Sequence, residues 1–248
     1  MKKLSALMMA SVIAFSSVSL FAAAPSTKAE PHPIKVVKAE YGSPVIEADI
    51  KVVDPIWKNI LPISFLQIKK GEITEETEFP SIKTMWNEDY VFILAEIDDS
   101  EIYKNVNPAM LHESDFTELY FNPLKDRSNA TYDDTEFWIK IHPDGTFESH
   151  ENAPEGIVYS AFTVEGGYVT QVKIPHELYE AKAGETIGFD FQIGDASAAT
   201  GKRDIILGWN DTVNSAWKNP SVVGELMFNP PVAALPADMT LMPPVNPQ

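Results

Sequence analysis

Residues 187–195 read IGFDFQIGD, and this stretch decides the fold class. Its apolar side chains fall on every second position from Ile187 to Ile193, while Asp190 and Gln192 stand between them. Successive side chains of a β-strand point to opposite faces of the sheet, so a period of two indicates a strand buried on one face. The stretch therefore predicts a strand with its aromatic side chains in the core and Gln192 on the other face.

Other segments repeat this alternation and are rich in aromatic and β-branched residues, which favour strands: residues 90–97, 116–121, 137–141 and 168–174. Turn-forming residues separate them, at 87–89, 143–145 and 165–167. Helical periodicity is confined to two short candidates, residues 55–60 and 176–183. Many short antiparallel strands with polar turns predict an all-β fold, an antiparallel β-sandwich of the immunoglobulin-like or jelly-roll type with one or two short helical turns.

The same alternation assigns side chains to faces. In residues 136–142, EFWIKIH, Phe137 and Ile139 share the inner face, and Trp138 stands on the other face among charged neighbours. In residues 115–121, DFTELYF, Glu118 faces opposite to the apolar set that includes Leu119. A tryptophan on a polar face indicates either a binding surface or a local patch under a loop.

The N-terminus has the plan of a secretory signal peptide, because two lysines precede an apolar stretch that ends in small residues. The signal is expected to span residues 1–29, with cleavage after Ala24 or Ala29, which predicts export to the extracellular space. The rest of the chain divides into a short leader (30–37), the sandwich (38–229) and a proline-rich tail (230–248).

The formal net charge of −17 becomes −19 once residues 1–24, which hold two lysines and no acid, are removed. So acidic a surface repels nucleic acid and anionic lipid, and it suits a neutral or cationic ligand. We expect a monomer that binds neither nucleic acid nor, after signal cleavage, a membrane. The chain has no cysteine, so disulfides and thiol-linked lipids are excluded.

Acidic residues gather at Asp98-Asp99 and at Asp133-Asp134. Calcium takes roughly six to eight oxygen ligands, which the loops of a sandwich can supply, so structural calcium is conceivable although no cofactor is required. The five histidines form no recognised metal-binding spacing.

Residues 96–101, EIDDSE, offer an alternative in which the chain is an enzyme. They resemble the E-x-D-x-x-E run of laminarinase-like glycoside hydrolases, and retaining hydrolysis needs two carboxyls about 5 Å apart. Glu96 and Glu101 would be the catalytic pair. Asp-Asp-Ser is also turn chemistry, so the other interpretation is a solvated acidic turn at the end of a strand.

Two tryptophans, Trp209 and Trp217, lie within the turn-rich residues 208–224, GWNDTVNSAWKNPSVVG. Trp209 continues the strand of residues 205–208 and is expected in the core. Trp217 follows Asn214 among polar residues, where an indole offers a flat apolar surface to a ligand. The alternative for Trp217 is a loop anchor that plugs one end of the sandwich.

Several landmarks together resemble a family 9 carbohydrate-binding module, a sugar-binding β-sandwich attached to secreted xylanases. They occur in the family's order and run from residue 38 to about residue 229: KAEYGSPVIEADIKVVDPIW (38–57), TMWNEDYVFILAEIDDSEI (84–102), SDFTELYFNP (114–123), EGGYVTQVKIP (165–175), IGFDFQIGDA (187–196) and GWNDTVNSAWKNPSVVGEL (208–226). The resemblance implies a sandwich fold. Haem-binding sandwich domains share this fold, so fold alone does not determine function.

In family members a sugar lies between two stacked tryptophans, with polar side chains reaching its hydroxyls. The resemblance assigns one stacking tryptophan to Trp217 and the hydroxyl partners to Asn214, Glu118 and Gln192. The second tryptophan should precede the strand of residues 116–121, where NPAMLHESD (107–115) offers only His112 and Met110. Trp138 stands where the resemblance places a family arginine, and it is the candidate for the second platform.

These observations predict a secreted, non-catalytic protein that binds plant cell-wall sugars derived from xylan or cellulose and supports polysaccharide breakdown. The ligand-binding residues are expected to be Trp217, Glu118, Gln192, Asn214 and Trp138. A glycoside hydrolase using Glu96 and Glu101 is the first alternative, and a haem-binding sandwich domain is the second.

Overall fold

The computed structural model of the protein describes residues 34–63, 67–72, 80–128 and 130–231. The predicted signal peptide and nearly all of the proline-rich tail lie outside these residues and stay predictions. Within the described ranges no helix is both long enough and apolar enough to cross a membrane.

Twelve strands and three short 3₁₀-helices make up the described part of the chain. The strands are β1 (Val36–Tyr41), β2 (Gln67–Lys70), β3 (Ser81–Trp86), β4 (Tyr90–Asp98), β5 (Phe116–Asn122), β6 (Phe137–Ile141), β7 (Phe147–Ser149), β8 (Val158–Val164), β9 (Gly167–Pro175), β10 (Thr186–Ser197), β11 (Lys202–Gly208) and β12 (Gly224–Phe228). The 3₁₀-helices are η1 (Pro55–Asn59), η2 (Pro108–Glu113) and η3 (Pro220–Val222).

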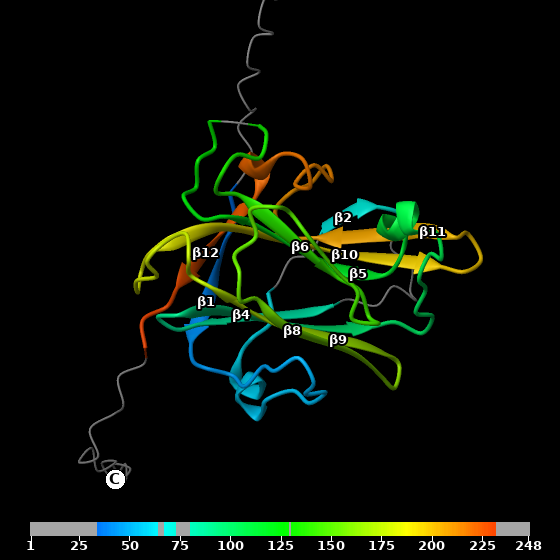
Figure 1. Cartoon of the computed structure of the whole chain (residues 1–248), viewed down its shortest axis with the longest axis horizontal. Coiled ribbons are helices and arrows are strands. Elements are labelled where there is room, and N and C mark those ends of the chain that lie inside the picture. Colours follow the sequence, from blue (N-terminus) through cyan, green and yellow to red (C-terminus); the bar gives the residue numbers. More distant parts are fainter. Residues whose placement is uncertain (1–33, 64–66, 73–79, 129, 232–248) are drawn as a thin grey trace, which may run out of the picture.

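The strands form two facing layers, as Figure 1 shows. One layer has the order β7-β6-β5-β10-β12-β1, with β11 beside β10 and β2 beside β11. The other layer has the order β1-β3-β4-β9-β8. The all-β sandwich that the sequence predicts is therefore confirmed.

Strand β1 belongs to both layers. Its first part, residues 36–39, pairs with β12, and Glu40 and Tyr41 pair with β3. Both pairings are parallel, whereas the other pairings among the described strands are antiparallel. The sequence predicts antiparallel strands, and β1 departs from this expectation, because alternation reports the face of a side chain but not the direction of the neighbouring strand.

The turns between neighbouring strands follow from local chemistry. The Asn87 side chain accepts hydrogen bonds from the backbone N–H groups of Asp89 and Tyr90, which closes the β3–β4 hairpin. Gly166 adopts a φ of 79° between β8 and β9, a conformation that glycine reaches without a steric penalty. Both are turns that the sequence predicts.

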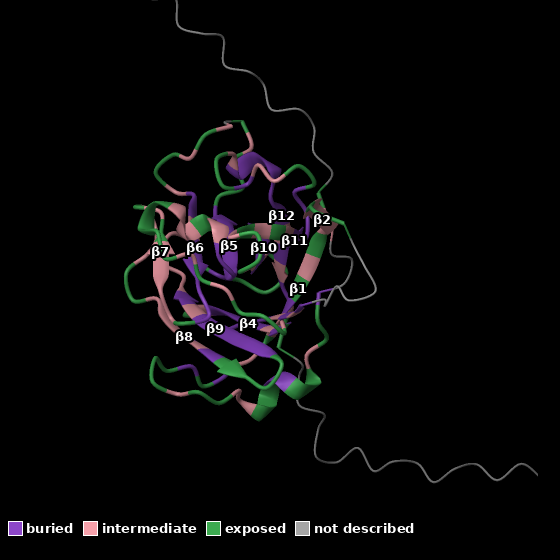
Figure 2. Ribbon diagram, turned by 90° about the vertical axis from the view of Figure 1, so that its right-hand side faces the viewer, coloured by how far each residue is buried: buried purple, intermediate pink, exposed green. Residues whose placement is uncertain are grey.

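The core lies between the two layers, and Figure 2 colours much of β4, β5 and β9 as buried. The predicted inner residues Phe137, Ile139, Phe189 and Phe191 all lie in this core. Trp209 is only 3% exposed and belongs to the same cluster, so its assignment to the core is confirmed. Trp138 is half-buried and packs instead against a separate outer cluster that includes Tyr120 and Val223.

The short helices match the expectation only in part. Residues 55–59 form η1, close to the predicted turn at 55–60. The second candidate, residues 176–183, is wrong as a helix, because these residues form turns and irregular backbone. Helix η2 was not predicted; the Asn107 side chain caps it by accepting from the N–H of Ala109, and Pro108 is its first residue.

Candidate functional site

Three polar side chains stand in a row across the outer face of β6, β5 and β10. Glu118 on β5 pairs in register with Lys140 on β6 and with Gln192 on β10. Paired residues of neighbouring strands project to the same face, so the sheet brings together side chains that lie far apart in sequence. Trp138 occupies the same outer face, paired with Tyr120.

Glu118 is the centre of a hydrogen-bonded group on this face. One carboxylate oxygen, Oε2, accepts from the Tyr120 hydroxyl at 2.7 Å and from the Gln192 amide nitrogen at 2.5 Å. The other oxygen, Oε1, lies 3.4 Å from the Lys140 ammonium group. Because Glu118 is almost fully buried, these partners are what makes its charge tolerable there.

The loop after β11 carries Trp217 to the same face. Backbone N–H groups of Val213, Ser215 and Ala216 all donate to the Asp211 carboxylate, which shapes the loop. The Trp217 indole N–H donates to the backbone carbonyl of Asn214 at 3.2 Å. Trp217 remains 53% exposed, so much of its ring faces solvent.

These elements surround one concave region of about 500 Å³, here called the Trp217 hollow. Its lining consists of His112, Glu118, Trp138, Lys140, Gln192, Arg203, Asn214 and Trp217. All five residues expected to bind the ligand therefore lie around one hollow. Their role in binding stays a prediction.

Three lining residues were not assigned a binding role from the sequence. Lys140 shares the outer face of its strand with Trp138, so alternation alone could have found it, and it supplies a positive charge beside Glu118. His112, on η2, lines the hollow in the segment that lacks the family's second tryptophan. Arg203 comes from β11, and no local pattern predicts how β11 is placed.

Two side-chain amides of the hollow have acceptor oxygens without a partner. Gln192 Oε1 and Asn214 Oδ1 are both buried, and neither has a hydrogen bond among the described residues. Buried carbonyl oxygens are nearly always hydrogen-bonded in proteins. A ligand that brings hydroxyl donors to this hollow would satisfy both.

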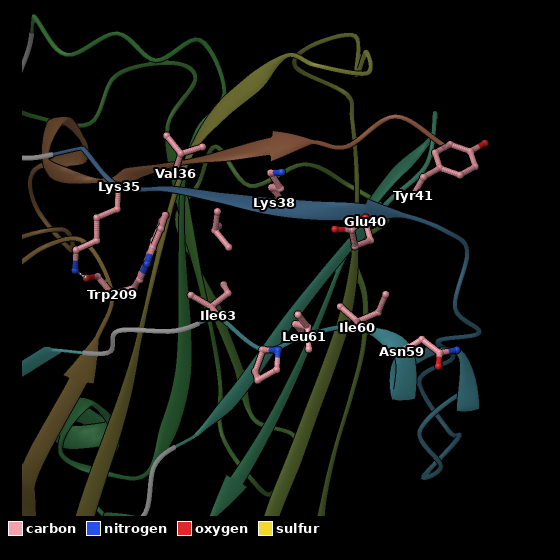
Figure 3. A pocket seen from close by; sticks show the side chains of 12 residues that line it. Lys35, Val36, Lys38, Glu40, Tyr41, Asn59, Ile60, Leu61, Ile63 and Trp209 are labelled. Atoms are coloured by element: carbon pink, nitrogen blue, oxygen red, sulfur yellow. Dashed lines mark hydrogen bonds between the residues drawn. The ribbon is translucent and has the colours of Figure 1, made fainter. Parts of the chain in front are cut away.

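A larger hollow of about 830 Å³ lies beside β1, between this strand and the segment after η1. Figure 3 shows it lined by aliphatic side chains such as Val36, Ile60 and Leu61 and by polar ones, with Lys35 reaching the backbone of Trp209. Its tryptophan is buried, and the Tyr41 hydroxyl is bonded to Glu88. Among the described residues, the β1 hollow therefore has neither an exposed indole nor a buried polar side-chain atom without a hydrogen bond.

Three aspartates form an acidic cluster: Asp99 follows β4, Asp115 precedes β5, and Asp195 lies on β10. The carboxylate oxygens of Asp99, Asp115 and Asp195 lie within 4.8 Å of one another. Burial raises the pKa of Asp115 to about 8, and the charges of its two neighbours add to the rise. The Tyr168 hydroxyl is buried without a hydrogen-bond partner among the described residues, and Tyr168 lines a cavity of about 20 Å³ with Asp99 and Asp195. Of the acids expected near calcium, only Asp99 belongs to this cluster.

The two glutamates of the hydrolase alternative are engaged elsewhere. Glu96 forms an ion pair of 3.0 Å with Lys83 on the neighbouring strand. Glu101 accepts a hydrogen bond of 3.0 Å from the backbone N–H of Ala198. Neither residue lines the Trp217 hollow.

Solved structures with a similar fold include two family 9 carbohydrate-binding modules from Caldicellulosiruptor kristjanssonii. The module in complex with cellotriose is 22% identical, has a TM-score of 0.67, and is matched over 86% of this chain and 100% of its own. The module in complex with glucose is 21% identical, has a TM-score of 0.68, and is matched over 81% of this chain and 99% of its own. These likenesses support the fold.

Curated relatives are much longer proteins. Endo-1,4-beta-xylanase A of Thermotoga maritima is 28% identical over 195 residues, which is 78% of this chain but 18% of the xylanase. Exoglucanase XynX of Acetivibrio thermocellus is 28% identical over 198 residues, which is 79% of this chain and 17% of that enzyme. The chain thus spans less than one fifth of each. A family model described as carbohydrate family 9 binding domain-like matches residues 48–229, so the chain belongs to this family.

Proposed function

We propose that this protein is exported and binds sugars derived from xylan or cellulose without catalysing a reaction, in support of polysaccharide breakdown. The observation that carries the proposal is the meeting of an exposed indole with unpaired polar groups in the Trp217 hollow. A pyranose has a flat face of C–H groups and a rim of hydroxyls, so it needs both an apolar platform and hydrogen-bonding partners.

Each residue has a distinct role in the proposed complex. Trp217 stacks on the sugar ring, and Trp138 extends the apolar wall. Glu118, Gln192 and Asn214 accept hydrogen bonds from hydroxyls, each contributing about 0.5–1.5 kcal/mol. No proton transfer or covalent step is required.

Removing the indole tests the proposal. Trp217→Ala should lower the affinity for cellotriose by about 2 kcal/mol or more, as loss of a central aromatic contact does. The matched control is Tyr41→Ala, which removes an exposed aromatic from the β1 hollow and should leave the affinity unchanged. Isothermal titration calorimetry with cellotriose and xylotriose measures both. Equal losses in the two variants, or no binding of either sugar to the unaltered protein, would refute the proposal.

A second assay distinguishes glycoside hydrolysis from sugar binding without catalysis. Release of reducing sugar from xylan or laminarin by the purified protein, abolished by Glu101→Gln, would replace the binding function with hydrolysis. We expect no release, because the ion pair of Glu96 and the hydrogen bond of Glu101 commit the two carboxylates to different partners.

The acidic cluster is the proposed site of a structural calcium ion. Three carboxylates from separate segments, with an unpaired tyrosine hydroxyl beside them, supply the oxygen ligands that calcium prefers. Calcium that binds only the folded protein raises its stability. Millimolar calcium should therefore raise the unfolding temperature of chelator-treated protein, and Asp99→Asn should remove most of that rise. An unfolding temperature that ignores calcium would exclude the site.

A further inference from the structure

Lys69 does not line the Trp217 hollow, but its buried ammonium group lies close to the loop that carries Trp217. The Lys69 side chain is fully covered although its strand, β2, is short and peripheral. Its ammonium group lies 3.7 Å from the Asp211 carboxylate and has no hydrogen bond among the described residues. Burying a charge costs free energy unless an opposite charge compensates it, so its position calls for a reason.

The buried charge of Lys69 stabilises the loop that carries Trp217. Asp211 accepts three backbone N–H groups of this loop, and the Lys69 ammonium group is the positive charge beside it. Burial opposes the ionisation of Asp211, but the Lys69 charge and the backbone donors together lower its pKa below the ordinary value. The carboxylate that shapes the loop is thus kept ionised with the help of Lys69.

A second carboxylate depends on the same ammonium group. Asp190 on β10 is fully buried and accepts the backbone N–H groups of Asn210 and Asp211, at the start of the loop. Burial raises the pKa of Asp190, and the Lys69 charge opposes this rise. Lys69 thus supplies positive charge to two buried carboxylates at the root of the loop, and Lys35 also interacts with Asp190.

Lys69 also approaches the strand side of the hollow. Its ammonium group lies 5.9 Å from the centre of the Tyr120 ring, and the hydroxyl of this ring donates to Glu118. Lys69 therefore lies near both the loop that carries Trp217 and the strand that carries Glu118.

A glycine makes the room for this lysine. A Cβ atom on Gly208 would lie 1.9 Å from Lys69 Cε, so no larger residue fits at that position while the side chain keeps its place. Gly208 pairs with Gln192 on β10 and with Gln67 on β2. The lysine thus passes directly beside the strand position that carries a hollow residue.

We infer that Lys69 is a positioning residue of the Trp217 hollow: its ammonium group, seated beside Gly208, holds the Asp211-centred loop and so sets Asn214 and Trp217 for the sugar. The inference deepens the proposed function, since the ligand is the one proposed above. The arrangement of the loop itself does not depend on that proposal.

Two variants and a control test it. Lys69→Met removes the charge and keeps the length of the side chain, whereas Gly208→Ala keeps the charge and displaces it. Lys83→Met is the matched control, because it removes a partly buried lysine ion-paired with Glu96 in the other layer. The readouts are amide hydrogen exchange at Val213, Ser215 and Ala216, quenching of Trp217 fluorescence by acrylamide, and affinity for cellotriose.

Lys69→Met and Gly208→Ala should each speed exchange at the three amides, alter quenching of Trp217, and lower cellotriose affinity about tenfold or more, or about 1.4 kcal/mol. Lys83→Met should change none of these. If the three amides exchange in Lys69→Met at the same rate as in the unaltered protein, the inference is overturned. If Lys69→Met does not fold, an unchanged exchange rate in Gly208→Ala overturns it instead. If the unaltered protein binds no sugar, the proposed function fails while the exchange readout still decides the role of Lys69.

Discussion

At the scale of single residues, Trp217 is oriented by a hydrogen bond and by its loop rather than by burial. Its indole N–H donates to Asn214, which adopts a φ of 55°. This left-handed conformation costs a non-glycine residue about 1–2 kcal/mol and persists only where the surroundings impose it. The Asp211 hydrogen bonds supply that constraint, so the platform is set before a ligand arrives.

Stability and affinity should respond in opposite order to two substitutions in the hollow. Trp217→Ala removes an exposed ring and should change the free energy of unfolding by about 0.5 kcal/mol or less. Glu118→Ala leaves Tyr120, Gln192 and Lys140 without their shared partner and should cost about 1–3 kcal/mol of stability. Its effect on cellotriose affinity should be smaller than that of Trp217→Ala.

Urea unfolding measures the stability of the two variants, and calorimetry on the same preparations measures their affinity for cellotriose. A Trp217→Ala variant that unfolds early while it still binds sugar would identify Trp217 as a loop anchor, the alternative interpretation of its sequence.

At the scale of elements, alternation predicted the central strands and their faces well. Residues 137–141 coincide with β6, and 90–97 with β4 to within one residue. Period two reports which side chains point inward, and it placed Gln192, Glu118 and Trp138 on the outer face. It says nothing about which strands become neighbours, so the contribution of Arg203 and Lys69 could not be predicted.

The remaining errors also have physical causes. Residues 176–183 have short apolar spacing compatible with a helix, but they form a turn in which His176 bonds to Tyr179 and to Asn87. Helix η2 is a 3₁₀ segment with no buried residue, so it leaves no hydrophobic period in the sequence. The only sequence features that indicate the start of η2 are its capping residue, Asn107, and its first residue, Pro108.

The turn that contains His176 makes a pH-dependent contribution to stability. The His176 Nε2–H donates to the Asn87 carbonyl and Nδ1 accepts from the Tyr179 hydroxyl, which fits a neutral imidazole. Burial lowers the pKa of His176 below its ordinary value of about 6.5. The unfolded chain therefore binds a proton first, so this contribution is complete above about pH 6.5 and is lost as the pH falls through the folded-state pKa.

We expect the unfolding temperature of the sugar-free protein to fall between pH 7 and pH 5, and His176→Gln to make this fall smaller. Circular dichroism melts across that range provide the measurement, and the exposed His112→Gln serves as the control. Identical slopes for the His176 variant and the unaltered protein would assign the acid sensitivity to other groups.

At the scale of the whole molecule, β1 makes one unit of two layers. It pairs with β12 in one layer and with β3 in the other, and the Trp86 indole N–H donates to the carbonyl of Asn229 just after β12. Neither layer can lose β1 without exposing backbone groups in the other. Unfolding in urea should therefore be a single transition that is the same by circular dichroism and by tryptophan fluorescence, in a protein that sediments as a monomer. Two separate transitions would show that the layers fold independently.

The parallel pairing of β1 with β12 also determines how the fold would respond to tension. In this pair the N-terminal end of β1 and the C-terminal end of β12 lie at opposite ends of the shared ladder. A force that pulls these ends apart slides the strands past each other and loads every bond between them at once, instead of peeling them open one by one. A force applied to the two ends of the sandwich at once would thus load the β1–β12 pair in shear, the direction in which a strand pair resists most.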